Sequence, residues 1–244
     1  MPSAERARVA ELIVTGHSGR RRGSGYRVST GAVLTAAHVV LDAVEVTVRF
    51  LSDLPGEWTS PATVVWSAGD VAVLRIDPPD TVPPVEFGVI DGRHAAFLPA
   101  HAVGFPLWKL RGDFRDSHQA SGTVTGLSGW RSETLEFTVP VPPERVSSGS
   151  PWEGMSGAAV WVDGAIVGVL ARHHASDGPG RLAAVRVEHL HRAPADVQAA
   201  VGWSGSPRDV VPPEPARVVR AAYQDEPRSI APCSCSTART NWTS

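Results

Sequence analysis

Cysteine is scarce in this sequence. Of 244 residues only Cys233 and Cys235 are cysteines, and both lie near the C-terminus. The chain before them cannot form a disulfide, so its fold must rest on a hydrophobic core, and the shortage favours a reducing compartment over secretion. A Cys-x-Cys pair is also too short to make a metal site alone. We expect neither a metal ion nor a cofactor.

Long apolar segments are missing as well. No run approaches the ~18 consecutive apolar residues of a membrane-spanning helix. No apolar stretch of signal-peptide length follows the N-terminal residues 1–8. We therefore expect a cytoplasmic protein that does not bind a membrane.

An excess of charge of one sign is absent too. The sequence has 23 Lys and Arg residues against 25 Asp and Glu residues, which gives a net charge of −2. Such a balance provides no general attraction to nucleic acid or to anionic lipid. Lys109 is the sole lysine, and Arg20-Arg21-Arg22 is the one basic run. We interpret this run as a solvated loop, with an anion site as the alternative.

What the chain does contain is a series of short strand-like segments between glycine, proline and aspartate turns. Residues 44–50 alternate apolar and polar side chains, which is typical of a half-buried strand. Residues 102–106 indicate a strand that closes the first half of the chain. Long helices do not alternate with these segments, so the pattern favours an all-β sandwich or barrel over a parallel α/β sheet. One helix is expected, over residues 188–201.

The composition changes after Gly202. Residues 204–244 contain six prolines, many serines and arginines, and few bulky apolar side chains. This composition is typical of a linker or disordered tail. We therefore predict one folded domain over residues 1–202 and a tail over residues 203–244 that could tether it to partner domains or proteins.

The segment Gly154-Met155-Ser156-Gly157 places a serine between glycines. Glycines allow a sharp bend that exposes the hydroxyl and turns backbone N–H groups toward one point. Turns often contain such small residues, so this motif alone is a weak signal. A serine nucleophile also needs a base and an acid that orients the base, and His38 and Asp70 are the candidates. Each of these two residues, taken alone, is more often structural.

Three segments together resemble the signature segments of trypsin-like serine proteases, in the same chain order. They are Leu34-Thr35-Ala36-Ala37-His38-Val39, Asp70-Val71-Ala72-Val73-Leu74 and Gly154-Met155-Ser156-Gly157. Two further segments, Gly23-Ser24-Gly25-Tyr26 and Ala102-Val103-Gly104-Phe105-Pro106, resemble the bacterial, disulfide-free HtrA-type branch. The resemblance covers about residues 8–200. Similar domains stand at the N-termini of large actinobacterial proteins.

The resemblance implies two packed six-stranded antiparallel β-barrels, with the active site between them and a C-terminal helix behind. Barrel one would span about residues 10–110 and barrel two about residues 117–187. In the family's arrangement His38 is the general base, Asp70 orients it and Ser156 is the nucleophile. The N–H groups of Gly154 and Ser156 would form the oxyanion hole.

The sequence departs from the family pattern at Met155, where the family usually has an aspartate that pairs with a newly cut N-terminus. Methionine cannot make that ion pair, so we predict no activation by N-terminal cleavage. By resemblance, Ser150 forms the base of the specificity pocket, and Ala171, Arg172 and His173 form its wall. Because Ser150 is not acidic, we do not expect a strong preference for Arg or Lys substrates.

The sequence therefore predicts a serine endopeptidase that hydrolyses peptide bonds of protein or peptide substrates through an acyl-enzyme. A tethered effector in a defence or signalling system is one role open to it. The alternative is a catalytically weak trypsin-like domain that acts as a binding or regulatory module. A structural domain with a chance triad is the third reading.

Overall fold

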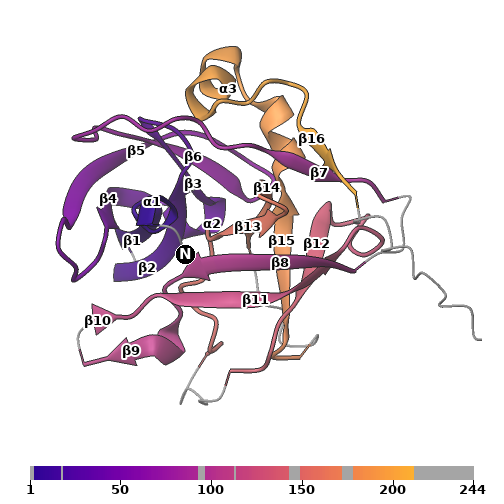
Figure 1. Ribbon diagram of the computed structural model, residues 1–244. Helices are drawn as coiled ribbons and strands as arrows, with labels where there is room; N and C mark the ends of the chain where they lie inside the picture. Colours follow the sequence, from indigo (N-terminus) through magenta and orange to yellow (C-terminus); the bar gives the residue numbers. More distant parts are fainter. Residues whose placement is uncertain are drawn as a thin grey trace, which may run out of the picture. The chain divides into compact units, whose positions relative to one another are not determined.

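Two closed barrels, each of six antiparallel strands, make up most of the protein (Figure 1). The computed structural model describes residues 3–17, 19–92, 97–112, 114–142, 149–171 and 178–211. These residues belong to one compact unit, Met1–Pro212. The architecture confirms the all-β double barrel that the resemblance implied. No helix in the described ranges is long and apolar enough to cross a membrane.

Barrel one closes in the strand order β1-β2-β3-β6-β5-β4. Its interior is filled by valine, leucine and phenylalanine because alternate residues of each strand point inward. β6 is buried along almost its whole length, since further apolar residues pack against its outer face. The strands are β1 (Val9–Gly16), β2 (Gly19–Arg27), β3 (Ala32–Ala36), β4 (Ala43–Phe50), β5 (Trp58–Ala68) and β6 (Val71–Ile76).

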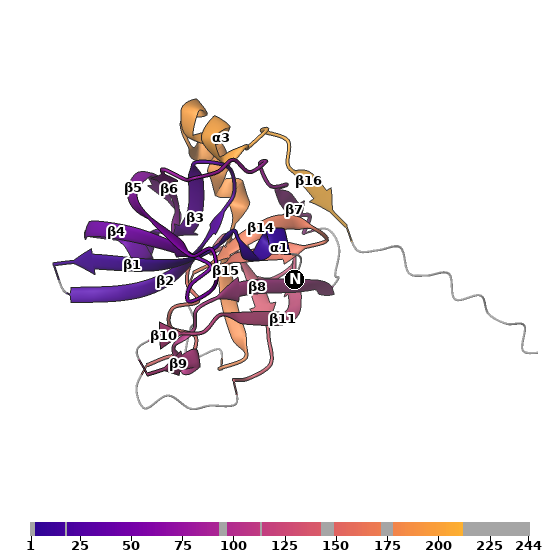
Figure 2. The same cartoon turned by 60° about the vertical axis from the view of Figure 1, so that its left-hand side comes forward.

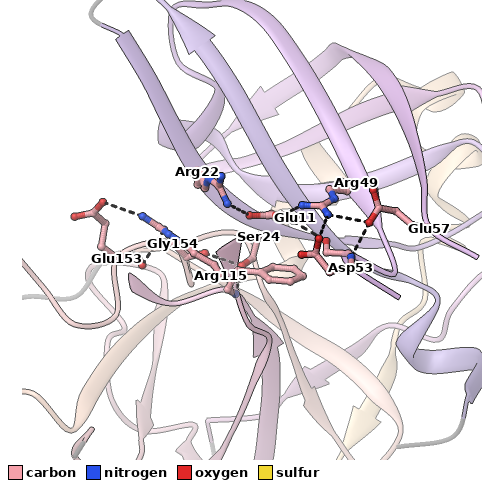
Figure 3. A network of polar contacts seen from close by, with 11 residues as sticks. Glu11, Arg22, Ser24, Arg49, Asp53, Glu57, Arg115, Glu153 and Gly154 are labelled. Atoms are coloured by element: carbon pink, nitrogen blue, oxygen red, sulfur yellow. Dashed lines mark hydrogen bonds and ion pairs between the residues drawn. The ribbon is translucent and has the colours of Figure 1, made fainter. Parts of the chain in front are cut away.

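The three arginines 20–22 lie within β2 rather than in a loop. Arg21 donates to the carbonyl of Val39 (2.7 Å), and Arg22 pairs with the buried carboxylate of Glu11 (2.7 Å). Arg49 approaches the same carboxylate from β4 at 3.5 Å (Figure 3). A buried carboxylate is costly unless it is paired, and these two arginines provide the pairing.

Barrel two closes in the order β11-β12-β15-β14-β13-β8. β8 therefore belongs to barrel two, whereas the sequence analysis placed residues 102–106 at the end of barrel one. Alternation identifies a strand but does not show which neighbour it pairs with. The strands are β8 (Phe97–Gly104), β11 (His118–Thr125), β12 (Thr134–Thr138), β13 (Ala159–Val162), β14 (Ala165–Leu170) and β15 (Arg181–Arg186).

Short elements join and cover the barrels. Two of them, β7 and β16, form a parallel pair. The remaining pair, β9 and β10, forms a small hairpin. The elements are α1 (Ser3–Arg6), α2 (Ala37–Val40), β7 (Gly88–Ile90), η1 (Leu107–Lys109), β9 (Leu110–Arg111), β10 (Phe114–Arg115), η3 (Val187–Arg192), α3 (Ala195–Val201) and β16 (Arg208–Val210).

The C-terminal part of the unit differs from the expectation in two ways. The expected helix over 188–201 is a 3-10 segment, η3, followed by a separate helix, α3, because Pro194 stands between them and cannot continue a helix. The unit also continues past residue 202. Trp203 is buried against Phe87 with ring centroids 5.4 Å apart, and β16 extends it further (Figure 2). The tail from residue 213 onward, with Cys233 and Cys235, lies outside the described residues.

The two barrels share one hydrophobic core across their interface. Ile166, Val169 and Val185 of barrel two pack in the same cluster as the interior of barrel one. An edge-on contact between Tyr26 of β2 and Trp161 of β13, with centroids 5.0 Å apart, crosses the same interface. The loop that carries Ser156 meets barrel one at this interface, where the Ser156 carbonyl accepts the N–H of Ser24 (2.8 Å).

Candidate active site

His38 and Asp70 meet on barrel one. His38 lies in α2, directly after β3, and Asp70 lies in the turn between β5 and β6. One Asp70 oxygen accepts the backbone N–H of His38 at 2.9 Å, and both oxygens lie 2.9–3.0 Å from His38 Nδ1. The backbone also contributes, because Ala37 N–H donates to the Asp70 carbonyl (3.1 Å). This double contact fixes both the backbone and the ring of His38.

The contact with Asp70 also decides the chemistry of the imidazole. A carboxylate accepts hydrogen bonds, so the Nδ1 atom that faces it carries the proton. The neutral ring then has its lone pair on Nε2, which is the atom that a general base uses. His38 and Asp70 are each about a quarter exposed, so the ring can still be reached from outside.

Ser156 lies on the barrel-two side of the interface. Its hydroxyl donates to the carbonyl of Ala171 at 2.7 Å. No hydrogen bond between Ser156 and His38 occurs among the described residues. The serine side chain therefore occupies a rotamer that points to Ala171, and a change of χ1 is needed before it can donate to the imidazole.

Hydrogen bonds to the backbone carbonyls hold the loop around Ser156 in place. The carbonyls of residues 153, 154, 155 and 156 all accept hydrogen bonds within the molecule. In chain order they accept from Leu107 N (2.7 Å), Ser24 Oγ (2.6 Å), Ala158 N (3.0 Å) and Ser24 N (2.8 Å). Each peptide plane of this loop is thereby fixed.

The N–H groups of the same loop behave differently. Met155 N–H donates to the carbonyl of Trp152 (2.9 Å). The N–H groups of Gly154 and Ser156 donate to no acceptor among the described residues. Most buried backbone donors are paired, and two unpaired donors one residue apart, beside a serine hydroxyl, are what a developing oxyanion requires.

Two positions in this loop admit only glycine. Gly154 has φ of 94°, and a Cβ there would lie 2.4 Å from the carbonyl oxygen of Phe105. Gly157 also has φ of 94°, and a Cβ there would lie 1.9 Å from the carbonyl oxygen of Ser24. Both the backbone conformation and the close approach therefore exclude a side chain.

Met155, where the family usually has an aspartate, is buried in the core of barrel two. Two residues earlier, Glu153 forms an ion pair with Arg115 of β10. The Arg115 guanidinium lies 3.5 Å from the Glu153 carbonyl oxygen and 3.8 Å from its carboxylate (Figure 3). Burial lowers the pKa of Arg115 from its ordinary value.

Two cavities flank the candidate triad. On the barrel-one side, a cavity of about 590 Å³ includes His38 and Asp70 in its wall. Beside Ser156 lies a cavity of only about 20 Å³, which has room for one or two water molecules at ~10–15 Å³ each. The small cavity is lined by Trp152, Met155, Ser156, Leu170, Ala171, Leu182 and Ala183.

Of the four residues expected to form the specificity pocket, the structure describes two, and only one of these lines the small cavity. Ala171 lines the small cavity. Ser150 does not line it and instead accepts hydrogen bonds from the backbone N–H groups of Trp152 and Glu153. Arg172 and His173 lie outside the described residues. No group of three or more His, Cys, Asp or Glu side chains suited to a metal ion occurs within the described ranges.

Sequence reasoning assigned no role to Ser24. It is fully buried on β2, yet it contacts Gly154 and Ser156, about 130 positions further along the chain. Thr35 Oγ1 in turn donates to the Ser24 carbonyl (2.8 Å). The one available signal in the sequence is a polar residue between two glycines, Gly23 and Gly25, and it lies in the buried second half of β2.

Comparison with known proteins agrees with the double-barrel fold and shows the family to which the chain belongs. No curated protein matches the chain at a significant level. Among solved structures, the chain is similar to the serine endoprotease from Yersinia pestis, with 20% sequence identity and a TM-score of 0.57, covering 79% of this chain and 63% of that one. It is similar to the HtrA-type protease AlgW with a bound tripeptide, also with 20% identity and a TM-score of 0.57, covering 82% and 62%.

The chain thus spans less than two thirds of the length of these structures, and at this identity the likeness shows the fold. The sequence model of the trypsin-like peptidase domain matches residues 23–169, which is more than half of the 244 residues. This match includes the second part of β2, the His38 and Asp70 segments and the loop around Ser156. The chain belongs to the trypsin-like peptidase family.

Proposed function

We propose that the protein is a serine endopeptidase in which Ser156 is the nucleophile, His38 the general base and Asp70 its orienting partner. The observation that carries the proposal is the pair of unpaired N–H groups, on Gly154 and Ser156, next to the Ser156 hydroxyl. The contact between His38 and Asp70 supports it, because it leaves Nε2 of the imidazole free to accept a proton.

In the proposed reaction the Ser156 side chain first turns from the Ala171 carbonyl to His38. His38 takes the hydroxyl proton while the oxygen attacks the substrate carbonyl carbon, and the two N–H groups bind the oxyanion that forms. The tetrahedral intermediate collapses, and His38 passes the proton to the leaving amine. Water, activated by His38 in the same way, then releases the acyl group and restores Ser156.

The small cavity beside Ser156 supports a preference for substrates with a small apolar side chain before the scissile bond. Apart from Ser156 its lining residues are of apolar types, and the Trp152 indole is held in place by a hydrogen bond to the Pro179 carbonyl (2.7 Å). A long cationic side chain would find neither room nor a carboxylate among these lining residues. Peptide-library profiling would show this preference directly.

A second function, a binding or regulatory module of low activity, is favoured by one observation. The Ser156 hydroxyl is hydrogen-bonded to Ala171 and not to His38. If this arrangement persists when substrate binds, the base cannot take the serine proton, and the cleft would bind peptides without cleaving them. The two proposals therefore differ in whether Ser156 becomes nucleophilic.

Labelling with a fluorophosphonate decides between them, because the reagent needs an activated serine. We expect the wild-type protein to be labelled, Ser156→Ala and His38→Ala to be unlabelled, and Ser204→Ala, which removes an exposed hydroxyl near α3, to be labelled like wild type. Folded wild-type protein that resists labelling and leaves a peptide library intact would contradict the peptidase proposal and support the binding module.

A further inference from the structure

We propose that Ser24 of barrel one is a positioning residue for the oxyanion hole, an inference that rests on the proposed peptidase function. Ser24 touches neither the hydroxyl of Ser156 nor the imidazole of His38 in the structure. It acts on the backbone of the loop that carries the two oxyanion donors (Figure 3).

The hydroxyl of Ser24 has its hydrogen-bonding roles fixed by its surroundings. Phe105 N–H points at the oxygen from 3.0 Å, and an N–H can only donate. The single proton of the hydroxyl therefore goes to the other partner, the carbonyl oxygen of Gly154, at 2.6 Å. Because Ser24 is fully buried, water cannot replace either contact without a change in the packing.

Ser24 holds alternate peptide units of the loop. The unit 153–154 carries the Gly154 N–H, and the next unit, 154–155, is held at its carbonyl by Ser24 Oγ. The unit 155–156 carries the Ser156 N–H, and the next unit, 156–157, is held at its carbonyl by Ser24 N. The two units that present oxyanion donors thus alternate with two units attached to one residue of barrel one.

The loop needs such a restraint because of Gly154. A glycine has no Cβ to limit its dihedral angles, so the peptide planes on both sides of it can rotate easily. Rotation of the 154–155 plane would bury the Gly154 carbonyl without a partner and would move the donor that precedes it. A misplaced oxyanion donor costs transition-state stabilisation and leaves ground-state binding intact.

The decisive variant is Ser24→Ala, which removes the hydroxyl and keeps the backbone N–H to Ser156. We expect kcat for a peptide substrate to fall at least about tenfold, since complete loss of an oxyanion donor costs ~10²–10³. KM should change less than about twofold. The affinity for a peptide boronate, which forms a tetrahedral adduct with the serine, should fall by the same factor as kcat/KM.

Ser29→Ala is the matched control. Ser29 is also a buried serine of the first barrel, and its hydroxyl donates to a backbone carbonyl, that of Ala200 in α3, away from the loop. It should lose stability to a similar degree and keep kcat and boronate affinity. If Ser24→Ala does not fold, Ser24→Cys, with a weaker donor of similar size, should show the same separation of kcat from KM, with a loss of at least about threefold.

The outcomes separate the two proposals. An active wild-type protein with a Ser24→Ala variant of equal kcat and equal boronate affinity would overturn the role of Ser24 alone. Equal losses of kcat in Ser24→Ala and Ser29→Ala would overturn it as well, because they would indicate a general effect of stability. A wild-type protein that neither cleaves peptides nor binds the boronate would overturn the peptidase proposal, and this one with it.

Discussion

At Asp70 and at the preceding Gly69 the backbone adopts a left-handed conformation that most residues avoid. Asp70 has φ of 67° and follows Gly69, with φ of 57°, so that the turn between β5 and β6 delivers the carboxylate to His38. The imidazole of His189 packs against Gly69, where a Cβ would lie 2.3 Å from the ring. Non-glycine residues in this region cost of order 1–3 kcal/mol and persist where the surrounding structure holds them.

At the residue scale, we predict that Gly157→Ala and Gly164→Ala differ sharply in stability. Both glycines have positive φ, but a Cβ at Gly164 would meet no atom within 4 Å, whereas one at Gly157 would meet the Ser24 carbonyl oxygen. Gly164→Ala should cost about 1 kcal/mol for the backbone conformation alone. Gly157→Ala should cost at least about 3 kcal/mol because the barrels must move apart.

Urea unfolding of the two variants measures this difference directly. Similar midpoints for Gly157→Ala and Gly164→Ala would show that the contact between Gly157 and β2 is looser than the structure indicates.

At the scale of elements, the region after α3 completes the fold. Trp203 packs on Phe87, and β16 pairs in parallel with β7. Arg208 ties this strand to the turn between β13 and β14 through an ion pair with Asp163 (2.7 Å). These contacts link the last described strand to both the connection between the barrels and barrel two.

We therefore predict that a chain ending at residue 202 is less stable than a chain ending at residue 212. The shorter chain lacks the buried Trp203 and the β16 pairing, and the loss of a buried tryptophan side chain costs about 3–5 kcal/mol. Thermal unfolding of both proteins checks the prediction. Equal melting temperatures would mean that Trp203 and β16 contribute nothing to the stability of the unit.

The sequence predicted the strands more reliably than the strands and loops with which they pair. Alternation and turn residues were enough for an all-β chain, and three short motifs indicated the family. The assignment of β8 to barrel two was missed because pairing depends on residues far along the chain. The role of Ser24 was missed for the same reason, since its contacts with Gly154 and Ser156 exist only once both barrels are packed. The break before Ala195 follows from Pro194, which cannot continue a helix.

At the scale of the whole molecule, buried and half-buried histidines link stability to pH. Burial is the largest cause that lowers the pKa of His101, His118 and His189 below the ordinary value of 6.5. His118 packs edge-on against Trp108, with centroids 4.7 Å apart. Protonation of such a ring is easier in the unfolded chain, so the unfolded state binds more protons between the folded pKa and about 6.5.

The free energy of unfolding contributed by these groups is therefore fully present above about pH 6.5 and is lost as the pH falls below it. We predict that His118→Phe, which keeps an aromatic ring, reduces the slope of stability against pH in this range. Burial is the main cause of the lowered pKa values, and salt screens exposed charges without changing desolvation. The slope should therefore be largely unchanged in about 1 M salt. A flat stability profile of the wild-type protein from pH 7 to pH 5 would contradict the assignment.

The attachment of the Ser156 loop to Ser24 has a consequence for the stage of folding at which the proposed activity can arise. The N-terminal half of a chain is synthesised first, so β2 with its Ser24 is made before the loop 149–157. The proposed oxyanion donors of this loop are therefore held by Ser24 only once the second barrel has docked on the first. A chain whose barrels have not docked carries the three proposed catalytic side chains but lacks the proposed oxyanion hole. In the proposed peptidase, hydrolysis is thereby confined to molecules in which both barrels have docked.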